Sequence, residues 1–141
     1  MKITKSLLAS LIKVCNRKLE LIAKSRQRTA SMLLEFASEG LDGEWKDPYR
    51  LRDKARDMEN LARICLQQTI VTKAKEIIGQ FGDQLNEGEN PSFPWLIQII
   101  NSQFRDMSTN DPTPYFMEFC QEFMDDLLRK ADRELDNMEE A

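Results

Sequence analysis

Apolar residues recur at helical spacing along the first part of the chain. Residues 4–39 contain no Pro or Gly, and stepping 100° per residue places Leu11, Cys15 and Ile22 on one broad side. A helix of this length runs about 50 Å. The pattern therefore predicts a single long amphipathic helix over residues 4–39, ended by Gly40.

The remaining pattern predicts three more helices, separated by polar loops. Asp47 followed by Pro48 is a typical cap and first-turn proline, and Gly79 and Gly82 are expected to mark the end of that helix. The third segment has little polar surface, so we expect it to be the most buried helix; its β-branched run leaves a strand as the alternative. The last segment repeats apolar pairs every four residues, which favours an amphipathic helix. The predicted ranges are 48–81, 94–106 and 114–138.

Four such helices predict an all-α fold, an elongated bundle with two long antiparallel helices and two shorter helices. The length of 141 residues, with 41% hydrophobic and 31% charged residues, fits one domain over 1–141.

The apolar side of the second helix changes direction along its length. It begins with Leu51, Ala55, Met58 and Ala62 and then rotates toward Ile70. A rotating apolar side implies that the helix changes its packing partner.

Charge is distributed unevenly over a chain whose formal net charge is −4. Residues 1–39 hold eight Lys or Arg against three Glu, a surplus of five positive charges, whereas residues 114–141 hold three bases against nine acids, a surplus of six negative charges. This asymmetry suggests a nucleic-acid surface on the basic part, attraction between the two ends, or both.

Two cations, Lys18 and Arg26, interrupt the apolar side of the first helix. Buried charges need partners, so we expect the acidic last helix to neutralise them and to leave the outer cations of the first helix free for a ligand. The candidate partners are Asp125, Asp126 and Asp132.

Cations also return repeatedly to the outer side of the first two helices. On the first helix three of them lie within about a sixth of a turn of Lys13, and on the second helix three arginines fall within about 40° of one another. Such stripes are the expected footprint of a phosphate backbone. The alternative is an ordinary solvated face with helix salt bridges, and the sequence does not tell whether the two stripes adjoin. The predicted contact residues are Lys13, Arg17, Lys24, Arg28, Arg52, Arg56 and Arg63.

The residue types present argue against catalysis. Histidine is absent, which removes the commonest general base and transition-metal ligand, and the five glycines form no phosphate-binding loop. Cys15, Cys65 and Cys120 lie far apart among apolar positions, so we expect free buried thiols rather than a zinc site or a disulfide framework. We therefore expect no enzyme activity, no cofactor and no metal.

The sequence also bears on location. Lys13 interrupts the short apolar run near the start, which argues against a signal peptide, and no apolar segment is long enough to span a membrane. We expect a cytoplasmic protein without membrane contact.

The overall plan resembles the small helical, non-catalytic subunits of CRISPR effector complexes. The resemblance covers the whole chain at the level of architecture and is carried by the seven predicted contact residues and the lack of a catalytic cluster. It implies copies that stack along a complex and touch the backbone of the target nucleic acid without cutting it.

The function expected from the sequence is that of a non-catalytic subunit of a nucleoprotein complex, which binds single-stranded nucleic acid or a heteroduplex through phosphate contacts without sequence-specific readout. Its expected partners are nucleic acid, DNA or RNA, and other protein subunits, including copies of itself. The alternative is a helical adaptor that binds a protein through its Phe-rich, acidic last helix. An exposed patch of Phe116, Phe119 and Phe123 would favour that alternative.

Overall fold

The computed structural model describes residues 2–38, 48–108 and 114–140. These residues form four α-helices: α1 (Lys5–Ser38), α2 (Pro48–Asn86), α3 (Phe93–Ser108) and α4 (Pro114–Glu140). Within the described ranges, the only β pairing is an isolated bridge between Lys2 and Ser92. The predicted all-α fold is confirmed, whereas the predicted end of the first helix at Gly40 and the Asp47 cap lie outside the described residues.

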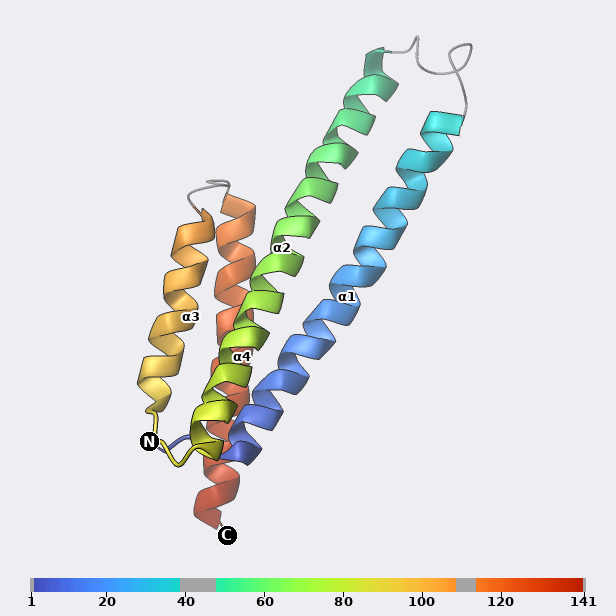
Figure 1. The fold of residues 1–141 in the computed structure, drawn as a ribbon. Coiled ribbons are helices and arrows are strands. Elements are labelled where there is room, and N and C mark those ends of the chain that lie inside the picture. Colours follow the sequence, from blue (N-terminus) through green and yellow to red (C-terminus); the bar gives the residue numbers. More distant parts are fainter. Residues whose placement is uncertain (1, 39–47, 109–113, 141) are drawn as a thin grey trace.

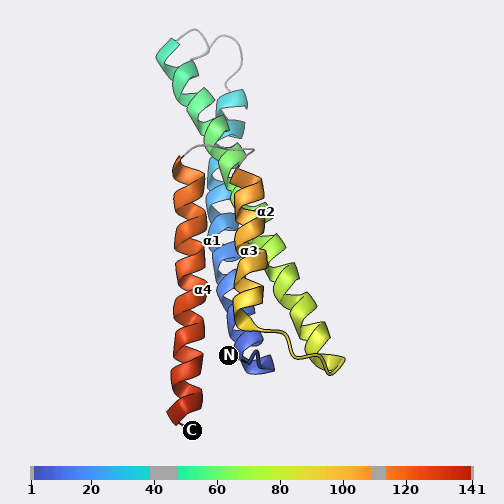
Figure 2. The same ribbon diagram turned by 90° about the vertical axis from the view of Figure 1, so that its left-hand side faces the viewer.

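The two longest helices, α1 with 34 residues and α2 with 39, run antiparallel and side by side (Figure 1). The shorter α3 and α4 cover one side of that pair where α1 begins and α2 ends (Figures 1 and 2). Beyond them α1 and α2 continue as a projecting pair of helices. Arg63 of α2 lies against Tyr115 near the start of α4, so we define the arm as the part beyond this contact, residues 30–38 of α1 and 48–62 of α2.

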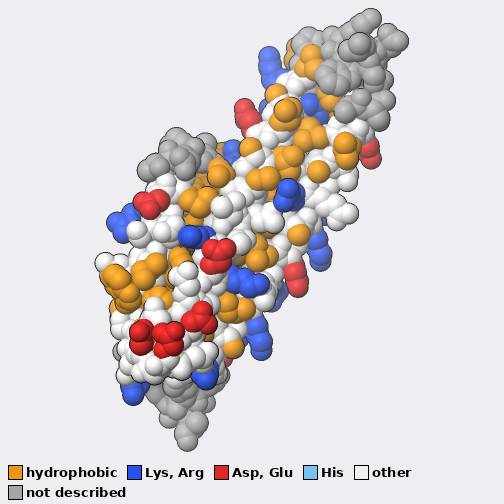
Figure 3. Space-filling view, viewed as in Figure 1, with side chains coloured by type: hydrophobic (Ala, Val, Ile, Leu, Met, Phe, Trp, Pro, Cys, Tyr) orange, Lys and Arg blue, Asp and Glu red, His pale blue; other side chains and the backbone are white. Residues whose placement is uncertain are grey.

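Hydrophobic side chains gather on the surface of the arm (Figure 3). Leu34 is 70% exposed and Met58 is 63% exposed. The predicted apolar start of α2 is therefore on the surface and outside the core, so the rotation of the apolar side runs from solvent into the core and not from one packing partner within the chain to another. The physical reason is rotation: fully buried Ile70 lies about 100° around α2 from Leu51. A helix that turns one side into the core must turn the other away.

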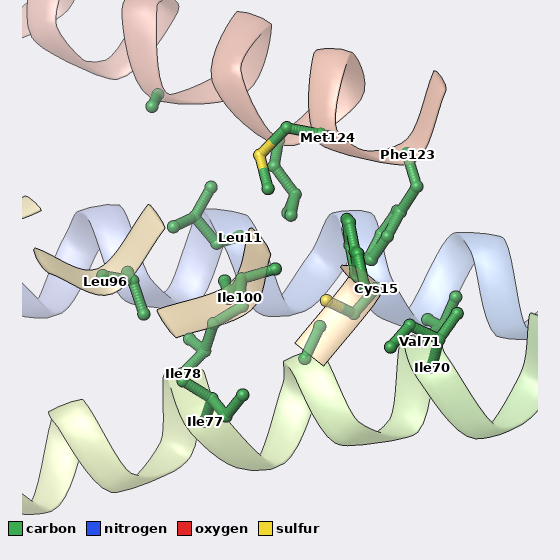
Figure 4. Close-up of a cluster of buried hydrophobic side chains, with 14 of the residues drawn as sticks. Leu11, Cys15, Ile70, Val71, Ile77, Ile78, Leu96, Ile100, Phe123 and Met124 are labelled. Carbon is green, nitrogen blue, oxygen red and sulfur yellow. The ribbon is translucent and has the colours of Figure 1, made fainter. Parts of the chain in front are cut away.

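The core lies where all four helices meet (Figure 4). Large apolar side chains from each helix point into the space between them, and fully burying one of these contributes about 1.5–3 kcal/mol. Fully buried members include Leu11 and Cys15 of α1, Ile70 and Val71 of α2, Ile100 of α3 and Phe123 of α4.

Capping side chains set the starts of two helices. The backbone N–H of Leu7 donates to Oγ1 of Thr4 at 3.1 Å, and that of Trp95 donates to Oγ of Ser92 at 3.3 Å. Each hydroxyl accepts from the residue three positions later, which is the N-cap arrangement. The predicted start of the first helix near Thr4 is confirmed, and Ser92 caps a third helix that begins at Phe93, one residue before the predicted start.

The second helix ends later than predicted, at Asn86 rather than at residue 81. Gly79 and Gly82 are accommodated inside it, since a helical glycine costs only about 1 kcal/mol relative to alanine, while the neighbouring Phe81 is buried. The stop is Gly88, whose φ is 87°. Its N–H donates to the Leu85 carbonyl at 3.1 Å, and the next N–H, of Glu89, donates to the Gln84 carbonyl at 2.9 Å. These two bonds form a Schellman motif, which ends the helix.

The third helix is buried on one side only. Leu96, Ile100 and Phe104 face the core, whereas Trp95 is 52% exposed. The prediction that this is the most buried helix is wrong, because α3 lies at the edge of the bundle beside α2 and α4 (Figure 2). In the described parts of the chain, none of the helices contains a stretch with the length and apolar character needed to cross a membrane.

Candidate anion-binding groove

Polar contacts fix how α4 lies along α1. The hydroxyls of Ser10 and Ser6 donate to the Glu134 carboxylate at 2.7 and 3.3 Å. Farther along α1, Nζ of Lys18 lies 3.3 Å from Oδ2 of Asp126. Earlier residues of α1 thus meet later residues of α4, so the two helices are antiparallel. The predicted neutralisation of Lys18 by an acid of the last helix is confirmed.

The second interrupting cation has a different partner. Nη1 of Arg26 donates to Oε1 of Gln68 on α2 at 2.7 Å, and both side chains lie toward the surface. The expectation that an acid of the last helix neutralises Arg26 is thus corrected, because its guanidinium contacts a neutral amide of α2.

A groove of about 440 Å³ runs between α1 and α4. Cations form both of its walls, Asp126 is its one acid, and two apolar side chains complete the lining. The wall from α1 holds Lys13, Arg17 and Lys18 with Val14 and Leu21, and the wall from α4 holds Arg129, Lys130 and Arg133 with Asp126.

The groove concentrates positive charge in an acidic protein. Six cations face one acid there, an excess of five positive charges, in a chain of net charge −4. Two like charges 4 Å apart repel by about 1 kcal/mol in water and more beside a protein surface. An anion held between the walls would relieve this repulsion. The guanidinium groups of Arg17, Arg129 and Arg133 also present forked donors that match the oxygens of a phosphate.

The structure brings only some of the predicted contact residues into this groove. Lys13 and Arg17 line it, and both are exposed. Lys24 and Arg28 are exposed farther along α1 and continue the same stripe by helical register.

The two outer arginines of the second helix lie elsewhere. Arg52 and Arg56 are exposed on the arm. The ammonium of Lys54 sits 5.4 Å from the ring centroid of Phe36, which places this part of α2 level with Phe36 on α1. Since Phe36 lies 19 residues beyond Arg17, Arg52 and Arg56 are about 28 Å along the helix axis from Arg17 in the groove.

Arg63 is occupied by contacts within the protein. Its guanidinium carbon lies 4.9 Å from the ring centroid of Tyr115, and its Nη1 donates to Oδ1 of Asn60 at 3.1 Å. The side chain is half-buried. These contacts tie α2 to the start of α4, a structural role for a residue that we expected to touch nucleic acid.

The cations of α4 are the candidate site residues that were not predicted from the sequence. Arg129, Lys130 and Arg133 belong to a segment with nine acids, so its overall charge concealed them. Their spacing was the available signal, because Arg129 and Arg133 stand four residues apart and share one helical face.

Two features of the described residues concern metal ligands and thiols. Among the described residues, no group of three or more His, Cys, Asp and Glu side chains is arranged to hold a metal ion. Burial raises the pKa of the Cys15 thiol to about 12 and that of Cys120 to about 11, so neither is a ready thiolate nucleophile.

Comparison of this chain with protein-family models, curated proteins and solved structures finds no match. Its function must therefore be inferred from the geometry of the groove.

Proposed function

We propose that this protein is a non-catalytic subunit of a nucleoprotein assembly that holds the sugar–phosphate backbone of single-stranded nucleic acid in the groove between α1 and α4. The observation that carries the proposal is the presence of cations on both walls, with an excess of five positive charges. Binding of a nucleic acid to such a surface is driven mainly by the release of counterions from its phosphates.

The dimensions of the groove favour a single strand. Packed helix axes are about 8–10 Å apart, so a groove between two adjacent helices accepts one chain of phosphates more readily than a whole duplex. Lys13 and Arg17 are one helical turn apart, a rise of about 6 Å. Lys24 and Arg28 repeat that spacing along α1 and extend the cationic surface beyond the groove.

The composition of the lining favours binding without sequence readout. Its apolar members are Val14 and Leu21, and no aromatic side chain lines the groove to stack on a base. Cationic contacts to phosphate position a nucleic acid but do not discriminate between bases. We place the protein in the cytoplasm, in keeping with three free cysteines, and in an assembly of the kind formed by the small helical subunits of CRISPR effector complexes.

The adaptor alternative relied on an exposed aromatic surface of the last helix. Phe116 and Phe123 are fully buried in the core, and Phe119 is partly buried against it. These rings hold α4 on the bundle, so they offer little surface to a protein partner.

The proposal is tested by fluorescence anisotropy with labelled single-stranded RNA and DNA, and with an RNA–DNA heteroduplex, at low and moderate salt. Two triple variants have the same net charge, and circular dichroism checks that both are folded. The groove variant is Arg17→Glu, Arg129→Glu and Arg133→Glu, and the control, at exposed positions outside the groove, is Lys5→Glu, Lys73→Glu and Arg105→Glu.

We expect the native protein and the control variant to bind single strands, and the groove variant to lose binding. Equal loss in both variants would show that only net charge matters and would contradict the groove. Absence of binding by the native protein at low salt would overturn the proposal, and tighter binding of the heteroduplex would contradict the preference for a single strand.

A further inference from the structure

The exposed apolar residues of the arm follow a regular spacing. On α2, Leu51, Ala55, Met58 and Ala62 are separated by four, three and four residues and are all exposed. This is the spacing of a helix that packs lengthwise against another helix. Packing in the core does not account for this spacing, because α2 turns a different side to the core.

The neighbouring helix adds to the same surface. Helical register places Ala30 and Leu34 of α1 on the side of the arm that carries the exposed stripe of α2. We call these six residues the arm seam: Ala30, Leu34, Leu51, Ala55, Met58 and Ala62. The view in Figure 3 shows hydrophobic side chains gathered over this part of α1 and α2.

The arm seam contains no charged residue. By register, Arg52 and Arg56 lie about 100–140° around α2 from Leu51, toward the side of the bundle where α3 and α4 pack. The exposed carboxylate of Glu59 lies about 80° around α2 from Leu51, at the border of the seam. An apolar partner face would therefore cover the six uncharged residues and leave this charge at the rim of the contact.

We propose that the arm seam is the contact through which two copies of this chain associate about a twofold axis, with their arms packed against each other. A second copy offers the same uncharged surface of the same length, which is the self-complementarity that a twofold interface requires. Two arms packed in this way place four helices together, two from each copy. Within one copy, α3 and α4 already complete a four-helix bundle with the other part of α1 and α2.

The area of the arm sets the strength of this association. The fifteen residues of α2 span about 22 Å and the nine residues of α1 about 14 Å, and each helix is about 10 Å wide, so each copy offers roughly 350 Å². A standard stable interface buries about 800 Å² per partner. The area is thus less than half of what a permanent dimer needs, and the dimer forms reversibly as protein concentration rises.

Sedimentation velocity over a wide range of protein concentration, without nucleic acid, tests the proposal. We expect the native chain to pass from monomer to dimer. Because a buried carboxylate in the interface would lack a partner, Met58→Asp and Leu34→Asp should each shift dimerisation to at least about tenfold higher concentration. The matched control is Met117→Asp on α4, where the native side chain is 57% exposed, and it should dimerise as the native chain does.

A cross-linking measurement identifies the contact directly. Cys15 and Cys120 are buried, so a Cys65→Ala background carrying Met58→Cys has one accessible thiol. Mild oxidation should join two copies of that variant but not two copies of the Met117→Cys variant. A native chain that stays monomeric at every concentration would overturn the proposal. So would a dimer that the seam substitutions leave unchanged. Neither result would bear on nucleic-acid binding in the groove.

Discussion

The salt dependence of binding counts the phosphate contacts in the groove. Six cations line it, and one of them, Lys18, is already paired with Asp126 at 3.3 Å. Five cations therefore remain for phosphates. For single strands, the logarithm of the binding constant falls with the logarithm of salt concentration by about 0.7 per contact, so full engagement predicts a slope of about −3.5.

The double variant Arg129→Gln and Arg133→Gln tests this count. It removes two contacts from one wall, and the predicted slope falls to about −2.1. Between 50 and 200 mM salt the native protein should then lose roughly 130-fold in affinity and the variant roughly 20-fold. Titrations of a labelled single strand at several salt concentrations measure both slopes.

The control for this prediction is Lys73→Gln with Arg105→Gln, two exposed cations outside the groove. Their loss should leave the slope at its native value. A native slope that persists in the groove variant, or an equal decrease in the control, would refute the assignment of phosphates to the wall formed by α4.

Four further predictions address charge, packing and titration. Asp126→Asn removes the one acid of the groove and releases Lys18, so the slope should steepen to about −4.2 and affinity should rise; weaker binding in the same titrations would contradict this. Phe123→Ala empties a fully buried core site and should lower the free energy of unfolding by about 3–5 kcal/mol in urea denaturation followed by circular dichroism; a loss under about 1 kcal/mol would be inconsistent with its packing. Glu134→Ala removes the acceptor of two serine hydroxyls on α1 and should cost about 1–3 kcal/mol in the same assay, whereas an unchanged midpoint would show that the contact is unimportant. Burial raises the pKa of Cys15 from 9.0 to about 12, so the thiol of the unfolded chain loses its proton at lower pH than the folded one. The free energy of unfolding should therefore be unaffected below pH 9 and decline from there toward pH 12, less steeply in Cys15→Ala. Equal declines in the two proteins would contradict this assignment.

Local signals in the sequence were sufficient to predict the helices and several of their ends. The caps at Thr4 and Ser92 depend on one hydroxyl and the three residues that follow it, so they can be read without knowing the fold. The end of α2 cannot be read in this way. Burial of Ile77, Ile78 and Phe81 in the core holds α2 helical past Gly82. The helix continues to Asn86, where the motif at Gly88 ends it.

The groove was predicted only in part, because it depends on the pairing of two distant helices. The stripe through Lys13 and Arg17 follows from the periodicity of one helix. The opposite wall depends on which side of α4 faces α1, and that is decided by the burial of Phe116 and Phe123 in the core. Once the rings face inward, Arg129 and Arg133 are brought to the edge beside α1. A charge count over the whole segment cannot show this.

The arrangement of the arm separates the two proposed contacts. Cations occupy the groove between α1 and α4, whereas the arm seam lies beyond α4 on the part of α1 and α2 that projects from the bundle. Two copies joined through the seam would therefore keep both grooves open, and one strand long enough to reach both would bind with a higher effective affinity than a short one. Met58→Asp should abolish that advantage of the long strand while leaving the affinity for a short strand unchanged. If short-strand affinity fell as well, the seam and the groove would belong to one surface, and two joined copies would not keep both grooves open.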